Sequence, residues 1–190
     1  MSVRARVTLT GVAAVVLMLA TAGGLGITGK WRATHVAAQG GTTVVLHKLA
    51  GDEVGTVTFT QSADKVLVQV SVSGLPPGFH GFHVHTVPLC DAGTGFMSAG
   101  GHFNPSDRRH ADHAGDMTNL YVGGDGTGGM SLWTDRFTVG QVLGMGGASV
   151  IIHASPDNFA NIPTRYAPAP DETTLTNGDS GDRIVCGLFQ

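Results

Sequence analysis

Seven of the nine histidines of this 190-residue chain fall between positions 80 and 153. Two of them, His83 and His85, are separated by a single residue. Side chains two apart on an extended strand project from the same face, so both imidazoles could reach one ion. A lone histidine at such a position is more often a hydrogen-bonded core residue than a ligand. The further imidazoles along the chain favour the metal-site interpretation.

These further histidines define two candidate ligand sets. Three or four imidazoles in a tetragonal arrangement suit Cu(II). The candidates for such a set are His83, His85, His102 and His153. Two imidazoles and a carboxylate, completed by one more imidazole, suit tetrahedral zinc. The candidates for that set are His110, His113 and Asp116.

The elements that must position these ligands look like β-strands. In Val66–Val72, four valines fall on one face, the period-2 pattern of a half-buried strand. With 29 glycines and only 13% charged residues, the chain predicts an all-β domain: an eight-stranded antiparallel Greek-key sandwich or flattened barrel. The eight predicted strands are Thr43–Leu49, Gly55–Thr60, Val66–Val72, Phe79–Thr86, Met117–Val122, Gly129–Thr134, Ala148–Ala154 and Arg183–Phe189.

The predicted connections also bear on function. Two of them are long, Val87–Gly115 and Ser155–Asp182, and both adjoin the histidines. Long loops in a compact domain are usually functional. A short helical turn is predicted at Thr138–Leu143, before the seventh strand.

The N-terminal segment is typical of a targeting sequence. Arg4 and Arg6 precede an uncharged run, Val7–Thr28, in which Ala20-Thr21-Ala22 is a candidate cleavage site. The run is also long enough to be a membrane anchor. We therefore expect a signal peptide or N-terminal membrane anchor at 1–28, a linker at 29–41 and the folded domain at 42–190. Both alternatives predict export to the periplasm, the cell envelope or the medium.

The chain has two cysteines, Cys90 and Cys186. In an exported chain this even number favours a disulfide, although two buried free thiols are the alternative.

The net charge of the domain bears on its partners. From residue 42 onward the chain carries 7 basic and 14 acidic side chains, a formal charge of −7. We do not expect so acidic a domain to bind nucleic acid, because the phosphate backbone is also negatively charged.

Five motifs, occurring in order, give the chain a resemblance to a known family. From about residue 42 to 190 it resembles the copper–zinc superoxide dismutases, most closely their exported bacterial members. The motifs are Gly-Phe-His-Gly-Phe-His-Val-His at 78–85, Ala-Gly-Gly-His-Phe-Asn-Pro at 99–105, His-Ala-Gly-Asp at 113–116, Ile-Ile-His-Ala-Ser-Pro-Asp at 151–157 and Gly-Asp-Ser-Gly-Asp-Arg-Ile-Val-Cys-Gly at 178–187.

The resemblance implies a role for each site residue. Copper would be held by His83, His85, His102 and His153. Zinc would be held by His102, as a bridging imidazolate, with His110, His113 and Asp116. Asp157 would hydrogen-bond one copper and one zinc histidine, although Asp also forms turns in a Pro-Asp-Asn context. Arg183 would hold the anionic substrate, and Cys90 would be bonded to Cys186.

The remaining histidines receive no metal role. His80 matches a structural position of the family that links backbone groups. His47 alternates outward on the first predicted strand and His35 lies in the linker, so solvation is the simplest interpretation of both.

Two features depart from the family pattern. Only two residues separate His110 from His113, where the family usually has about eight, so both rings must reach one ion from a single turn. If zinc is absent, Asp116 and His113 would instead brace His102 by hydrogen bonds. The segment 171–176 also lacks the lysine that related enzymes use to guide substrate, which predicts weaker electrostatic steering.

The implied activity is dismutation of superoxide to dioxygen and hydrogen peroxide at a copper ion cycling between Cu(II) and Cu(I). Copper is required because zinc cannot change its oxidation state. In that scheme Arg183 positions superoxide and His102 carries a proton. The alternative is a non-enzymatic copper-buffering protein of the envelope on the same scaffold, for which the substrate arginine would be unnecessary. The resemblance leaves a homodimer and N-terminal membrane anchoring open.

Overall fold

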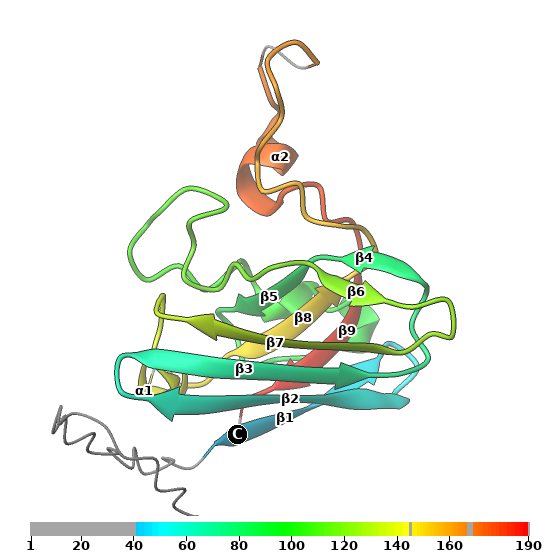
Figure 1. Cartoon of the computed structure of the whole chain (residues 1–190), viewed down its shortest axis with the longest axis vertical. Helices are drawn as coiled ribbons and strands as arrows, with labels where there is room; N and C mark the ends of the chain where they lie inside the picture. The colour runs from blue at the N-terminus through cyan, green and yellow to red at the C-terminus, as the bar shows by residue number, and fades with distance from the viewer. Residues whose placement is uncertain (1–40, 145, 167–168, 190) are drawn as a thin grey trace, which may run out of the picture. The chain divides into compact units, whose positions relative to one another are not determined.

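A computed structural model describes residues 41–144, 146–166 and 169–189. Among these residues it contains nine strands in one antiparallel sheet, in the order β4-β6-β7-β3-β2-β1-β9-β8-β5 (Figure 1). The strands are β1 (Thr42–Lys48), β2 (Glu53–Ser62), β3 (Lys65–Val72), β4 (Gly78–His80), β5 (Phe82–His85), β6 (Leu120–Val122), β7 (Gly128–Thr134), β8 (Ser149–His153) and β9 (Arg183–Leu188).

The sheet is nearly closed, because its two end strands are consecutive in the chain. β4 and β5 are separated only by Gly81, whose N–H donates to the carbonyl of Ser155 and whose carbonyl accepts from the N–H of His153. The sequence predicts one strand here, Phe79–Thr86. Gly81 divides it into two, with β4 paired to β6 and β5 paired to β8. The predicted all-β barrel is therefore confirmed, with nine strands rather than eight.

The core lies between the layers of this barrel. Alternate residues of β3, from Val66 to Val72, are buried, as the period-2 pattern predicts. The rings of Phe59 and Phe137 pack together with centroids 6.3 Å apart, and Phe103 approaches Phe137 at the same distance. Phe103 directly follows His102, so the core fixes the backbone of one candidate ligand.

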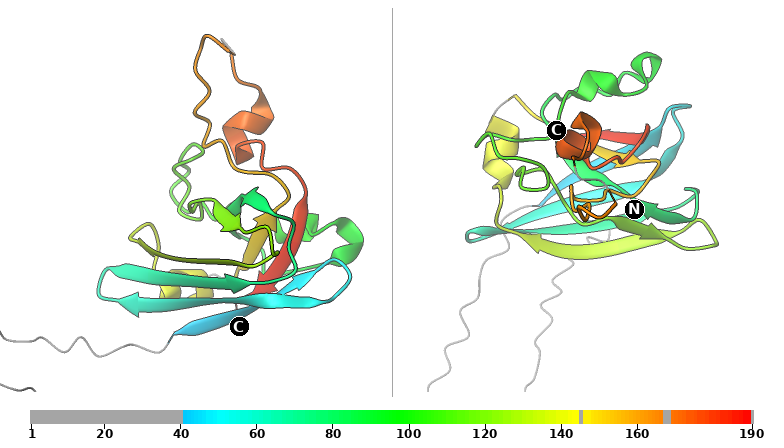
Figure 2. Two further views of the ribbon diagram at one scale, coloured as in Figure 1. Left: turned by 45° about the vertical axis from the view of Figure 1, so that its right-hand side comes forward. Right: turned by 90° about the horizontal axis from the view of Figure 1, so that it is seen from above.

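The second long connection projects beyond β4 and β6 and carries α2 (Glu172–Asn177), and part of the first lies beside it (Figures 1 and 2). The first contains two 3-10 turns, η1 (Ala92–Thr94) and η2 (Met97–Ala99). The sequence analysis does not predict α2. The predicted helical turn before β8 is present as α1 (Val139–Gly144). β6 is shorter than predicted, because residues 117–119 make no regular ladder.

The predicted signal peptide or anchor at 1–28 and most of the linker at 29–41 lie outside the described residues. Within the described residues, no helix is both long and apolar enough to cross a membrane.

Candidate metal centre

β5, β8 and the loop before β6 bring four imidazoles together. His83 and His85 lie on β5, His153 ends β8, and His102 pairs with His85 through an isolated bridge. One ring nitrogen from each of these four residues lies within 4.8 Å of the corresponding atom of the other three. The structure thus places the four predicted copper ligands at one point.

Each of these rings uses one nitrogen for a hydrogen bond and leaves the other without a partner. The bonded nitrogens are His83 Nε2 with Asp157 Oδ2 at 2.8 Å, His85 Nδ1 with Gly100 O at 2.9 Å, His102 Nδ1 with Asp116 Oδ1 at 2.6 Å and His153 Nδ1 with Gly181 O at 3.0 Å. The other four nitrogens are buried and have no hydrogen-bond partner among the described residues. Unpaired buried polar atoms are rare because they are costly, and a metal ion would satisfy all four. The site fits copper.

A second ligand set shares His102 with the first. Its potential ligand atoms come from His102, His110, His113 and Asp116, and all lie within 4.8 Å of one another. Asp116 Oδ1 lies 3.2 Å from His113 Nδ1, and Asp116 Oδ2 lies 3.1 Å from His110 Nδ1. The two-residue link between His110 and His113 therefore allows both rings to reach one point. His102 directs Nε2 to the first set and Nδ1 to the second.

Asp157 contacts one histidine of each ligand set without belonging to either set. Its carboxylate is buried, with Oδ2 2.8 Å from His83 Nε2 and Oδ1 2.9 Å from His110 Nε2. Each ring is thereby held with its other nitrogen toward the metal position. Asp157 lies where its predicted role requires.

Gly178, which ends α2, packs directly against this carboxylate. Its φ of +64° is left-handed, and a Cβ at this position would lie 1.8 Å from Asp157 Oδ1 and 2.6 Å from His110 Nε2. Gly178 begins the fifth sequence motif, but the motif alone predicts no role for it. An acidic N-cap at Asp171 and a glycine after six residues could have indicated the helix, but not its contact with Asp157.

Replacing Gly178 by alanine is expected to destabilise the metal-free protein more than backbone strain alone would. Gly51→Ala is the matched control, because Gly51 also has a positive φ and its Cβ would meet no atom within 4 Å. We expect Gly178→Ala to cost about 1–3 kcal/mol more than the control, the range for overpacking a well-packed site. Denaturant unfolding of both variants measures the difference, and equal losses would contradict the packing argument.

The electrostatics differ between the two sets. Burial lowers the pKa of His102 to about 4 and that of His153 to about 3. These rings are neutral at pH 7, which is the state that binds a metal. Burial also opposes charge on His110, but the carboxylates of Asp116 and Asp157 outweigh it and raise the pKa of His110 to about 9. The ring of His110 must therefore lose a proton when it binds an ion.

Arg183 lies beside the first ligand set and lines the cavity next to it. Its Nη1 donates to the carbonyl of Phe96 at 2.9 Å and its Nη2 to that of Gly100 at 2.7 Å. With His102 and His153 it lines a cavity of about 610 Å³. Among the described residues that line this cavity, Arg183 is the only cation and Asp182 the only acid. An anion that enters is therefore drawn to the guanidinium beside the imidazoles.

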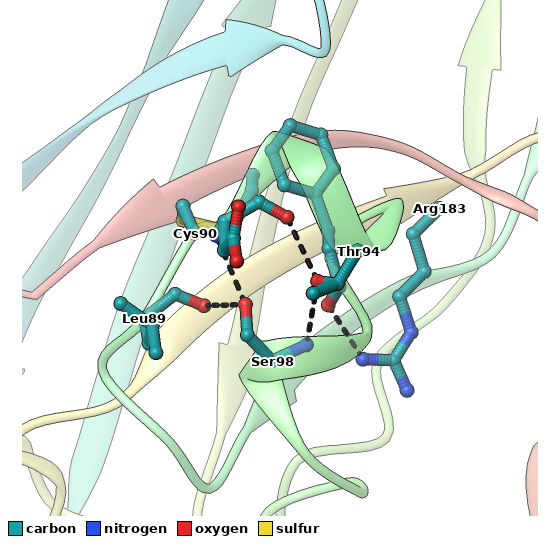
Figure 3. The surroundings of a disulfide bond; sticks show 8 residues. Leu89, Cys90, Thr94, Ser98 and Arg183 are labelled. Carbon is teal, nitrogen blue, oxygen red and sulfur yellow. Dashed lines mark hydrogen bonds between the residues drawn. A yellow bond between two sulfur atoms is a disulfide. The ribbon is translucent and has the colours of Figure 1, made fainter.

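A disulfide anchors the segment that holds Arg183. Cys90 is bonded to Cys186 of β9, 96 positions later in the chain. Between Cys90 and Gly100 the chain folds back on itself, and Ser98 Oγ donates to the carbonyl of Leu89 (Figure 3). Arg183 contacts the far side of the same segment (Figure 3). The disulfide thus ties the acceptors of Arg183 to the strand that carries Arg183.

The other histidines do not join either set. His80 is buried, and its two nitrogens lie 2.7 Å from the carbonyl of His153 and 2.8 Å from that of Pro76. It links backbone groups, as predicted. His47 is exposed beside the carbonyl of Gly51, and His35 lies outside the described residues.

Comparison with known sequences points to one family. The family model for copper/zinc superoxide dismutase matches residues 53–189. The "Superoxide dismutase [Cu-Zn]" of Mycolicibacterium paratuberculosis is 40% identical over 82% of this chain and 72% of that protein. The protein of the same name from Mycobacterium tuberculosis is 41% identical over 73% of this chain and 65% of that protein.

Comparison with solved structures gives the same fold. A superoxide dismutase-like protein from Bacillus subtilis is 29% identical, with a TM-score of 0.66 over 79% of this chain and 99% of that structure. The clock protein EA4 is 28% identical, with a TM-score of 0.64 over 78% of this chain and 93% of that structure.

Proposed function

This chain belongs to the copper/zinc superoxide dismutase family, and we infer that it is an enzyme that dismutes superoxide. The products are dioxygen and hydrogen peroxide, and the cofactors are copper and zinc. We assign copper to His83, His85, His102 and His153, and zinc to His102, His110, His113 and Asp116. The observation that carries the copper assignment is the convergence of four unpaired, buried imidazole nitrogens beside the guanidinium of Arg183.

The chain's own residues divide the work of the reaction. Bound copper would supply electron exchange through its two oxidation states, and His102, His110, His113 and Asp116 would hold zinc. Arg183 binds and orients the small anion, since its planar fork offers several donors and a fixed charge. His102 would carry a proton for the reduced substrate at Nε2, whenever that nitrogen is not bound to copper. Asp157 keeps the rings of His83 and His110 in position.

Arg183→Ala is expected to lower the rate constant for superoxide about tenfold or more while copper content stays unchanged. The physical reason is the loss of the one cationic side chain found among the described residues of the cavity wall. Pulse radiolysis measures the rate constant directly. Arg165→Ala, which removes an exposed arginine stacked on Tyr166, is the matched control for the lost charge. Equal rate constants for the two variants would contradict the role of Arg183.

The rival function, copper buffering without catalysis, makes a different prediction. A buffer needs the four imidazoles but has no use for an arginine fixed by two carbonyls at the cavity mouth. Copper-loaded protein should consume superoxide above the background of the same amount of free copper, and metal-free protein should not. A copper-loaded sample at the background rate would favour the buffer.

We also propose where the enzyme works and how it assembles. The basic start and uncharged run at 1–28 and the disulfide support export, as a periplasmic, envelope or secreted enzyme. Fractionation of cells and N-terminal sequencing of the mature protein distinguish a cleaved signal peptide from a membrane anchor.

The aromatic rings of Phe79 and Tyr121 are exposed, and their centroids lie 5.0 Å apart. This exposed apolar pair supports a homodimer, which light scattering tests.

A further inference from the structure

The backbone between His110 and His113 is held from outside by a single arginine. Arg136 Nη1 donates to the carbonyl of Ala111 at 2.8 Å and to that of His113 at 3.2 Å. Its Nη2 lies 3.4 Å from the carboxylate of Asp112. One guanidinium thus contacts all three residues from 111 to 113, which include the whole link between the two histidines.

The position of Arg136 is itself fixed. It follows the end of β7, and its backbone N–H donates to Thr134 Oγ1. The next residue, Phe137, is buried against the rings of Phe59 and Phe103. The guanidinium therefore extends from a rigid base in the core rather than from a loop.

The inner side of the same link is held by the candidate ligands. The carboxylate of Asp116 accepts the backbone N–H of His113 at 3.0 Å, and the carbonyl of His113 accepts from both Asp116 N–H and Arg136. A two-residue link leaves no length to absorb error, since both rings must reach one point. The link is therefore held on its inner side by Asp116 and on its outer side by Arg136.

We propose that Arg136 is a positioning residue for the second metal site, holding the His110–His113 link in the shape that lets both rings bind one zinc ion. The inference rests on the proposed assignment of His102, His110, His113 and Asp116 as zinc ligands. It adds a residue that contacts no ligand atom of that set and acts through the carbonyls of Ala111 and His113. Partners hydrogen-bonded directly to a metal-ligating side chain change metal affinity 10- to 100-fold when they are removed, so a residue that acts through the backbone should have an effect near the low end of that range.

The competing explanation is that Arg136 makes only an exposed ion pair with Asp112. Both side chains are substantially exposed, 39% and 75%, and pairs of this kind contribute little. Asp112→Asn removes the ion pair and keeps both carbonyl contacts of Arg136. If Arg136 acted on the zinc site through this ion pair, Asp112→Asn and Arg136→Ala would weaken zinc binding alike. If it acts through the two carbonyls, only Arg136→Ala weakens it.

The experiment uses zinc and Co(II) as probes on the full-length, metal-stripped protein. Zinc affinity is measured by competition with a chromophoric chelator, and the visible absorption of Co(II) reports the coordination geometry. His113→Ala defines the part of each signal that belongs to the second site. Copper content and denaturant unfolding of the metal-free protein are recorded for each variant as checks of the first site and of folding.

We expect Arg136→Ala to weaken zinc binding about tenfold, the low end of the range for direct partners of metal ligands, and to alter the Co(II) spectrum, with copper content unchanged. Arg136→Lys, which keeps the charge without the fork, should fall between Arg136→Ala and the unchanged protein. It also serves as the test if Arg136→Ala does not fold. Asp112→Asn should bind zinc within twofold of the unchanged protein.

Two results would overturn the inference. Zinc affinity within twofold of the unchanged protein in both Arg136 variants would show that the link needs no outer support, and the ligand assignment would stand. If the wild-type protein gave no zinc or Co(II) signal that His113→Ala removes, the second site would not bind metal. Both the ligand assignment and the role of Arg136 would then be wrong.

Discussion

His102→Ala is expected to weaken metal binding at both sites at once, by at least about tenfold each. His102 is the one residue common to the two ligand sets, with Nε2 in the first and Nδ1 in the second. Loss of an outer hydrogen-bond partner already costs 10- to 100-fold in affinity, so loss of a ligand should cost at least as much. Dismutase activity should fall to background because the proton carrier is removed as well. Copper and zinc titrations against competing chelators measure both affinities.

Two single-site variants make this prediction specific. His153→Ala should weaken copper and spare zinc, and His113→Ala should weaken zinc and spare copper, since each belongs to one set. A His102→Ala protein that bound either metal as tightly as the unchanged protein would contradict the bridging assignment.

Removing the disulfide is expected to lower the free energy of unfolding by about 4–5 kcal/mol. The bond joins residues 96 positions apart, and closing so long a loop removes much of the entropy of the unfolded chain. The double variant Cys90→Ala, Cys186→Ala is preferable to serine, because Cys186 is almost fully buried beside Phe96, Ala99 and Ile151. A serine hydroxyl there would add the cost of an unpaired polar group.

Denaturant unfolding of the double variant, with the oxidised and the chemically reduced unchanged protein beside it, measures this loss. The reduced protein should resemble the variant. A loss below about 1 kcal/mol would mean that the chain-entropy argument fails for this loop. Activity should also decline, since the segment from Cys90 to Gly100 carries both acceptors of Arg183.

Much of the barrel and the ligand sets could be predicted from local patterns. Alternating valines such as those of β3 indicate that one face of the strand is buried. The spacing of His83 and His85 indicates that both side chains lie on one face of a strand. The break at Gly81 could not be predicted, because it depends on hydrogen bonds to residues 153 and 155. α2 lacks an apolar face, and its ends are set by Asp171 and Gly178 rather than by periodicity.

The residues that the sequence analysis missed act through tertiary contacts. Gly178 begins the fifth motif, but only the fold shows that it packs against Asp157. Arg136 reads as a surface charge after a strand, and only the fold brings its guanidinium to carbonyls 25 and 23 positions earlier. The spacing of His110 and His113 raises the question of whether both rings can reach one ion. Whether they can depends on the contacts of Asp116 and Arg136 with the link, which no local sequence pattern indicates.

Anomalous diffraction from crystals of the metal-loaded protein, recorded at the copper and zinc absorption edges, shows which metal each ligand set holds. We expect one copper peak bounded by Nδ1 of His83 and Nε2 of His85, His102 and His153. We expect one zinc peak at about 2.0–2.1 Å from the Nδ1 atoms of His102, His110 and His113, with Asp116 as fourth ligand. A map without a copper peak among the first four nitrogens would show that these histidines do not form a copper site.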